Sequence, residues 1–330
     1  MPFNLLPVPE IPPGLREAAL RGNLIPFIGA GVSRIAGSPG WNDFADAALR
    51  WLIRNGGLSY SQLDQVQHLP PRVKLSLART IAREKKLSVD YAALLHPIPK
   101  ADHQVGRRLY DSLFSLGKIF VTTNYDLWLD EQLPAVSPSP QQAVDPTHAN
   151  TLNEMRVVYQ PEDFLPALLS EANTVIHLHG SVRDPERMVL TTSDYIDRYS
   201  GYGRSPSDPQ TENRVLTFLD HLFNYKTVLF VGYGLEELEV LEYILEKGVR
   251  RTGEARHYML QGFYSHQEML MQTYASYYLS ECGIDLISFR RDEKDWDQLA
   301  AVIEAFAREM PATSPMILQQ MQEMAGLLNE

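Results

Sequence analysis

The stretch NLIPFIGAGVSR, residues 23–34, joins a short apolar run to a turn built almost entirely of small residues. The apolar run contains β-branched and aromatic side chains and ends on a glycine, which is typical of a buried strand. Small residues after a strand let the chain enter a helix with its backbone open to a phosphate group. The stretch therefore predicts a strand, a ligand-binding turn and a helix, in that order.

Further apolar segments with the character of strands follow along the chain. They are KIFVTTN (118–124), TVIHLHG (174–180), KTVLFVGYG (226–234), HYMLQGF (257–263) and IDLISF (284–289). Helical patterns separate them, including WNDFADAALRWLIRN (41–55), PEDFLPALLSEA (161–172), VLTFLDHLFNY (215–225), LEELEVLEYILEKG (235–248) and a segment around 266–282. Because nearly continuously apolar strands that alternate with helices form buried parallel sheets, we predict an α/β fold: a Rossmann-like parallel sheet with helices on both faces.

The sequence predicts three parts. Residues 1–13 contain five prolines and are expected to form an extended arm. Residues 14–312 are expected to form the Rossmann-like domain. A helical module of about 57–115 is inserted in it, because this stretch shows helical periodicity without a convincing strand. Residues 313–330 contain the pair Ser314-Pro315 near their start and carry one apolar stripe, which predicts a C-terminal helix.

Composition limits the partners and the compartment. Thirty Lys and Arg face 41 Asp and Glu, giving a net charge of −11, so direct binding to the polyanionic backbone of nucleic acid is not expected. The single cysteine, Cys282, excludes an intrachain disulfide framework and a cysteine-based zinc ribbon, and fits a reducing compartment. We find neither a signal-peptide pattern nor an apolar run of membrane-spanning length. A cytoplasmic protein without membrane contact is predicted.

A redox cofactor site is disfavoured by spacing. GAGVSR supplies only the first two glycines of the dinucleotide fingerprint, with Arg34 in the third place. A redox Rossmann unit also needs a second strand with an acidic residue about twenty residues further on, and that region is helical here. Four small-residue turns (GAGVS, TTNYD, HLHGS and VGYGLEE) nevertheless each follow a strand candidate. They can therefore converge on one edge of one sheet.

The order of these motifs resembles the sirtuin family from about residue 21 to 290. The chain contains five short motifs in the order that this family has them: GAGVS, GSPGW, TTNYD, HG and GYG. The resemblance implies an NAD site in which Asn124 and His179 act at the nicotinamide ribose. It also implies NAD contacts at Gly29, Ala30, Gly31, Val32, Ser33, Trp41, Asp126, Gly232, Tyr233 and Gly234.

The chain also departs from the deacetylating sirtuins. Their GIPDFR motif reads GSPGWN at 37–42, which loses the acid and the arginine. The resemblance implies that Trp41 takes the aromatic place that packs over the nicotinamide ribose. Thr123 replaces the usual glutamine, and one cysteine cannot build their four-cysteine zinc module. These features resemble bacterial sirtuin-like domains that hydrolyse NAD in anti-phage defence. That resemblance implies NAD as a substrate, no metal, a homo-oligomer, and a partner defence protein such as a hexameric ATPase or a short Argonaute.

Other interpretations remain open at this point. His177 and His179 have a metal-ligand spacing, although no convincing set of further ligands follows them. His179 can instead be a structural core histidine, and Asn124 can simply cap a turn. A non-catalytic module that senses NAD or ADP-ribose, and an NAD-dependent deacylase or ADP-ribosyltransferase, would use the same site.

The two histidines are expected to have different roles. Val175, His177 and His179 are predicted to share one face of a strand, with His179 nearest its carboxyl end. His179 should therefore contact the nicotinamide ribose. His177 is expected to be neutral and partly buried, and to position His179 or Asn124 by hydrogen bonding.

Overall fold

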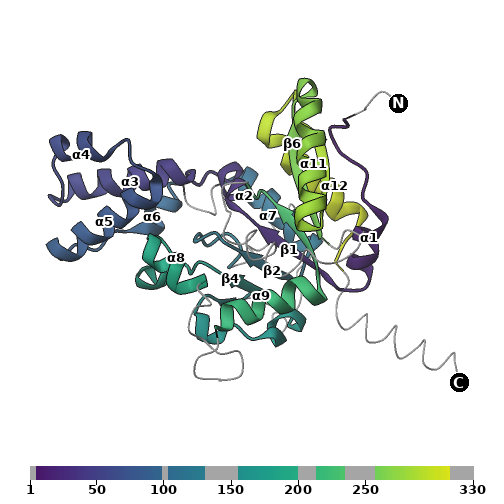
Figure 1. Cartoon of the computed structure of the whole chain (residues 1–330), viewed down its shortest axis with the longest axis horizontal. Helices are drawn as coiled ribbons and strands as arrows, with labels where there is room; N and C mark the ends of the chain where they lie inside the picture. The colour runs from purple at the N-terminus through teal and green to yellow at the C-terminus, as the bar shows by residue number, and fades with distance from the viewer. Residues whose placement is uncertain (1–4, 99–102, 131–154, 200–212, 235–256, 313–330) are drawn as a thin grey trace, which may run out of the picture.

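The structure is a computed structural model that describes residues 5–98, 103–130, 155–199, 213–234 and 257–312. Its described strands form one parallel sheet of seven, in the order β3-β4-β2-β1-β5-β6-β7 (Figure 1). The predicted Rossmann-like α/β fold is thus confirmed. The strands are β1 Leu24–Ile28, β2 Ile119–Thr122, β3 Arg156–Val158, β4 Thr174–His177, β5 Thr227–Val231, β6 His257–Phe263 and β7 Ile284–Arg290.

Helices cover both faces of the sheet. On one face, buried side chains of α1 (Pro13–Leu20), α7 (Gln104–Leu116) and α12 (Gln298–Glu309) form one core cluster with the sheet. On the other face, α9 (Arg214–Tyr225) and α11 (Glu268–Cys282) contribute to a second cluster. Consecutive residues of one strand, such as Phe27 and Ile28 of β1, enter opposite clusters, as the two-residue period of a strand requires.

The position of β1 determines where a ligand can bind. The chain proceeds from β1 to β2 and β4 on one side of the sheet, and later to β5, β6 and β7 on the other side. Ile28 at the end of β1 pairs with Val231 at the end of β5, so the turns after these strands are neighbours. Open α/β sheets form a crevice at the carboxyl ends of the strands where the strand order reverses.

A helical module lies at one end of the molecule (Figure 1). It consists of α3 (Trp41–Arg54), α4 (Tyr60–Val66), α5 (Pro71–Lys85) and α6 (Tyr91–Leu95), which share a third core cluster. This packed unit differs from the predicted insertion of about 57–115. It includes α3, whereas α7 packs on the sheet. Short α2 (Ala30–Ile35) connects β1 to the module.

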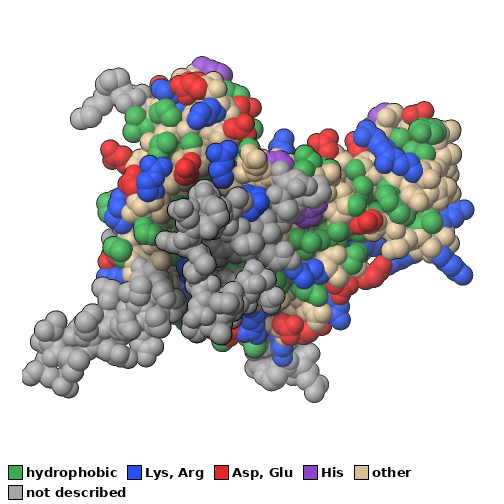
Figure 2. All heavy atoms as spheres, turned by 180° about the vertical axis from the view of Figure 1, so that it is seen from behind, with side chains coloured by type: hydrophobic (Ala, Val, Ile, Leu, Met, Phe, Trp, Pro, Cys, Tyr) green, Lys and Arg blue, Asp and Glu red, His purple; other side chains and the backbone are tan. Residues whose placement is uncertain are grey.

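The surface of the module differs in charge from the rest of the chain. Residues 41–95 contain eight Lys and Arg against five Asp and Glu, whereas the whole chain has 30 against 41. In Figure 2, Lys and Arg side chains are prominent at the outer end of the module, while both signs are interspersed over the sheet portion. Within the described chain, no helix combines the length and hydropathy that crossing a bilayer requires.

Two predicted segments differ in the structure or lie outside it. PEDFLPALLSEA is not a helix: it forms two 3-10 turns, η2 Pro161–Asp163 and η3 Pro166–Ser170. Pro166 has no N–H for a helical bond and holds Leu165 in an extended conformation, which ends the first turn. The helices expected at 235–248 and 313–330 fall outside the described residues.

The remaining described elements are one short α-helix and three 3-10 turns. They are α8 (Thr192–Tyr199), η4 (Pro185–Arg187), η5 (Ser265–Gln267) and η6 (Asp295–Asp297). The described part of the proline-rich arm, residues 5–12, has no regular structure and is bonded to the domain. Leu6 O accepts the N–H of Arg290 at 2.8 Å, and Pro7 O accepts Nε2 of Gln298 at 2.8 Å.

Candidate active site

A cavity of about 590 Å³ runs along the carboxyl edge of the sheet, from the helical module to the end of β6. This volume lies within the usual range for small-molecule sites. Most of the residues predicted to bind NAD or to act on it line this cavity: Ala30, Gly31, Ser33, Trp41, Asn124, Asp126, His179, Gly232, Tyr233 and Gly234. The other two, Gly29 and Val32, are not among the lining residues, and Val32 is fully buried in the core.

The two glycine turns touch each other at the centre of this cavity. Gly31 N–H donates to Gly232 O at 2.8 Å. A Cβ on Gly31 would lie 2.7 Å from that same oxygen, and one on Gly29 would lie 2.6 Å from it. Gly232 itself has φ +65°, a conformation that favours glycine. The glycines are therefore required because two turns from neighbouring strands approach closely at the reversal of the strand order.

Asn124 is held by a buried polar network just after β2. Its Nδ2 donates to Ser33 Oγ at 2.9 Å and to Gly29 O at 3.1 Å. Ser33 Oγ in turn donates to Asp126 Oδ2 at 2.6 Å and lies 3.0 Å from the Tyr110 hydroxyl. Both N–H groups of the Asn124 amide are thus used within the protein, and its Oδ1 accepts no hydrogen bond from any described residue. That oxygen can accept a hydrogen bond from a ligand hydroxyl or a water.

His179 lies in the turn after β4, because the strand ends at His177 and does not extend as far as predicted. The side chain is 3% exposed, and its Nε2 is buried without a hydrogen-bond partner among the described residues. Burial, together with the nearby cations of Arg198 and Arg72, lowers the pKa of His179 to about 3. The imidazole is therefore neutral at physiological pH and keeps one ring nitrogen for a ligand, although it is a weak base.

His177 is fully buried and fully bonded. Its Nδ1 lies 2.8 Å from Asn124 O and its Nε2 lies 2.9 Å from Asp130 Oδ1. Burial by itself lowers the pKa of His177, but the Asp130 carboxylate and the two hydrogen bonds outweigh it, and the net pKa is raised. The expected partial burial is therefore wrong, because His177 is 0% exposed, and the two facing acceptor oxygens favour the protonated ring over the expected neutral one. The predicted hydrogen bonding to Asn124 is confirmed, through the backbone carbonyl.

This pairing also argues against a metal at the two histidines. Both ring nitrogens of His177 are engaged by protein oxygens, and Asp130 Oδ2 accepts Nε of Arg183 at 2.5 Å. A metal ligand needs a free lone pair on one ring nitrogen. The part of the chain that the structure describes contains no group of three or more His, Cys, Asp or Glu side chains that could hold a metal ion.

Aromatic and basic side chains that sequence reasoning missed complete the wall near His179. Trp41 is stacked on Tyr125, with ring centroids 5.9 Å apart, and the guanidinium of Arg72 lies 3.8 Å from the centroid of the Tyr195 ring. Tyr195 packs edge-on against His179 at 5.1 Å. Tyr125 could have been found, because it lies inside the TTNYD motif.

Some other residues that line the cavity lie outside the five motifs, so no sequence pattern selects them. Arg34 follows the first glycine turn directly, and Gln261 and Trp296 line the far end of the cavity, near β6 and η6. Arg34 is exposed, and it makes no ion pair with any described residue. The cavity thus has aromatic residues at both ends and an arginine among its lining residues.

Comparison with known protein families agrees with this geometry. Residues 118–287 match the family model described as a SIR2-like domain, which is just over half of the chain. The chain therefore belongs to the family of SIR2-like domains, the sirtuin-like family that its motifs resemble. Domains of this family bind NAD, which suggests an NAD-using enzyme. No curated protein matches the chain.

Proposed function

We propose that this chain is an NAD hydrolase that cleaves NAD to nicotinamide and ADP-ribose. The observation that carries the proposal is His179: a buried, neutral imidazole with an unpartnered nitrogen in the same cavity as Asn124 and both glycine turns. A core histidine with a purely structural role would have both ring nitrogens satisfied, as His177 has.

The reaction needs few protein groups. The bond between ribose C1′ and the pyridinium nitrogen breaks, its electron pair goes to nicotinamide, and a water oxygen bonds to C1′ and loses a proton. Nicotinamide leaves as a neutral molecule, so no general acid is required. The protein must instead stabilise an oxocarbenium-like transition state and orient one water.

The structure supports a division of these tasks between two side chains. Asn124 Oδ1, the free acceptor of a rigid amide, orients the water or a ribose hydroxyl. His179 supplies a hydrogen bond at the ribose, and its pKa of about 3 favours that role over proton abstraction. Trp41 packs over the nicotinamide ribose, and the turn at Gly232–Gly234 holds the adenosine half.

Incubating the purified chain with NAD and separating the products tests the proposal. Wild-type protein should release nicotinamide and ADP-ribose in equal amounts. Asn124→Ala and His179→Ala should each lower turnover by at least ~100-fold while the far-ultraviolet circular dichroism is unchanged. His221→Ala is the matched control, because His221 lies on α9 and does not line the cavity.

The outcomes separate the candidate activities. ADP-ribose found on an acceptor, or nicotinamide released only with an acyl-lysine peptide, would replace hydrolysis by transfer or deacylation. NAD binding without any product would make the chain a sensing module.

We further propose that this hydrolysis serves anti-phage defence in the bacterial cytoplasm. The support is the departure of the GSPGWN segment and the single cysteine from the deacetylating pattern. In this proposal the chain works as a homo-oligomer, with a partner defence protein such as a hexameric ATPase or a short Argonaute. Cells that express the wild-type chain with its partner should lose NAD during phage infection, and cells that express Asn124→Ala should not.

A further inference from the structure

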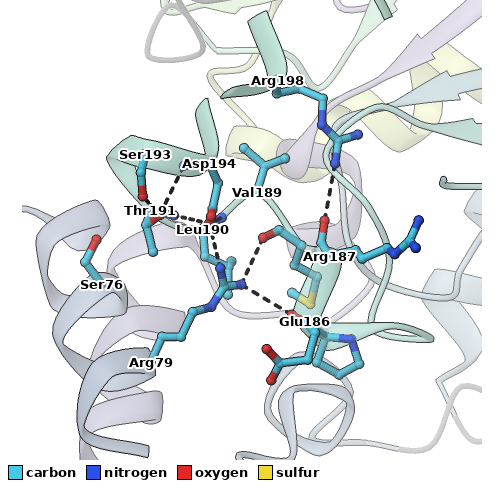
Figure 3. A network of polar contacts seen from close by, with 12 residues as sticks. Ser76, Arg79, Glu186, Arg187, Val189, Leu190, Thr191, Ser193, Asp194 and Arg198 are labelled. Atoms are coloured by element: carbon cyan, nitrogen blue, oxygen red, sulfur yellow. Dashed lines mark hydrogen bonds and ion pairs between the residues drawn. The ribbon is translucent and has the colours of Figure 1, made fainter. Parts of the chain in front are cut away.

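Figure 3 shows Arg79 of the helical module bound to the loop that precedes α8 and to Asp194 of α8. Arg79 of α5 is only 7% exposed. Its Nη1 donates to Asp194 Oδ2 at 2.7 Å, and its Nη2 donates to Met188 O at 2.9 Å and to Pro185 O at 3.3 Å. One guanidinium therefore joins α5 to the first turn of α8 and to the loop that precedes it.

The residues that this guanidinium binds lie next to the backbone of His179. Val189, directly after one of the bound carbonyls, donates its N–H to His179 O at 2.8 Å. Gly180 has φ +83°, and a Cβ there would lie 2.9 Å from Arg187 O. The backbone at 179–180 is thus packed directly on 187–189, so a shift of one segment shifts the other.

The carboxylate partner of Arg79 is itself fixed to the backbone. Asp194 Oδ2 also accepts the N–H groups of Leu190 at 2.9 Å and Thr191 at 2.8 Å. Without the guanidinium, this partly buried carboxylate loses its only cationic partner among the described ion pairs, and the buried Met188 carbonyl keeps only the N–H of Leu190, at 3.1 Å. Both changes favour rearrangement of the loop, because buried unpaired groups are costly.

The orientation of the His179 ring depends strongly on this loop. A histidine whose ring nitrogens are hydrogen-bonded would be oriented by those bonds as well. Nε2 of His179 makes no hydrogen bond to a described residue, so the ring is placed by its backbone and by the neighbouring rings alone. A displacement of about 1 Å at a catalytic group can cost on the order of 100-fold in rate.

We propose that Arg79 is a positioning residue, by which the helical module sets the place of His179 in the cavity. The inference rests on the proposed NAD hydrolysis for its kinetic consequence. Arg79 does not line the cavity, so it acts through the loop and does not contact NAD.

Arg83 offers a matched control on the same helix. It lies four residues further along α5, and its Nη2 donates to Glu186 Oε2 of the same loop at 2.8 Å. Both side chains of this pair are exposed, at 61% and 74%, and exposed ion pairs contribute little to structure. The two arginines thus differ in burial and in the carbonyls that Arg79 alone binds.

Steady-state kinetics with NAD tests the proposal. In folded Arg79→Met, kcat should fall at least ~10-fold while KM changes less than ~3-fold, because the residue acts on the placement of His179 and not on NAD binding. Arg83→Met should keep both constants within ~2-fold of the wild type. A folded Arg79→Met with wild-type kcat overturns the proposal, and so does an equal loss in Arg83→Met.

A second readout does not depend on hydrolysis. With ¹⁵N-labelled histidine rings, the His179 resonances, assigned by their loss in His179→Gln, should move in Arg79→Met and stay in place in Arg83→Met. If the wild type shows no NAD cleavage but the resonances move as expected, the proposed function fails and the positioning role stands. Unmoved resonances overturn the positioning role, whatever the activity.

Arg79→Lys keeps the proposal testable if Arg79→Met does not fold. Lysine retains the charge that faces Asp194 but lacks the planar fork that reaches a carboxylate and a carbonyl together. We expect a kcat between those of the wild type and Arg79→Met, at ~3-fold to 10-fold below the wild type, and a smaller shift of the His179 resonances. Wild-type kcat and unshifted resonances in Arg79→Lys overturn the proposal.

Discussion

Lowering the pH should destabilise the folded chain through His179, and His179→Gln should remove this part of the loss. Burial and the cations of Arg198 and Arg72 lower the pKa of His179 from 6.5 to about 3. Between these two pKa values, the His179 side chain therefore binds a proton in the unfolded chain but not in the folded chain. Stability is then fully present above the unfolded pKa and is lost as the pH falls towards the folded one.

The size of the effect follows from these two pKa values. With 6.5 in the unfolded state and about 3 in the folded state, the loss between pH 8 and pH 5 is ~2 kcal/mol. Urea unfolding of the wild type and His179→Gln at both pH values measures it, because glutamine has no proton to bind and the other titrating groups are shared. Equal losses in the two proteins would refute the buried neutral imidazole.

His177 provides a control of opposite sign. Its pKa is raised in the folded state, chiefly because the Asp130 carboxylate outweighs the effect of burial. It therefore adds stability that is present at acid pH and is lost as the pH rises through its folded pKa. Accordingly, His177→Gln should lose more stability than the wild type between pH 8 and pH 5, where His179→Gln loses less.

Three further predictions concern the turns, the metal and the C-terminus. Gly31→Ala places a Cβ 2.7 Å from the backbone oxygen of Gly232 and should cost ~2 kcal/mol by urea unfolding, whereas Gly40→Ala, which meets only side-chain atoms no closer than 3.4 Å, should cost much less. Chelators should leave NAD cleavage unchanged, and metal analysis should find no stoichiometric zinc; one zinc per chain contradicts this. Removing 313–330 should reduce the assembly state measured by light scattering if the segment joins protomers, and an unchanged mass contradicts that role.

The strands and the turns of the site could be predicted because their signals are local. Each strand that lines the site is an apolar run followed within a few residues by Gly, Asn or His, as at Gly29, Asn124 and Gly232. Strand order reverses at β1, so these turns meet without any information from distant residues. The motifs were therefore sufficient to place ten of the twelve predicted residues on the cavity wall.

The contacts that set the charge and position of the histidines could not be predicted in this way. Asp130 lies 47 residues before His177, and Arg79 lies 115 residues before Asp194. No periodicity or motif links residues so far apart. The Asp130–His177 contact exists only after the segment that follows β2 has come together with the end of β4, and the Arg79–Asp194 contact only after the module and α8 have packed together. The failed helix at 161–172 has a local cause, since Pro166 lies in the middle of an otherwise helical pattern.

Two histidines only two residues apart have different surroundings, and β4 ends between them. Asn124 O and the Asp130 carboxylate are both acceptors that face the ring nitrogens of His177, which favours its protonated form and raises its pKa. His179 lies beyond the strand, against tyrosine rings and two arginines, which keeps it neutral. The proposed cleavage of NAD places developing positive charge on the ribose, and a neutral imidazole adds no further positive charge there. His177 therefore fixes Asn124 from behind, while in the proposed reaction the neutral His179 can face the sugar.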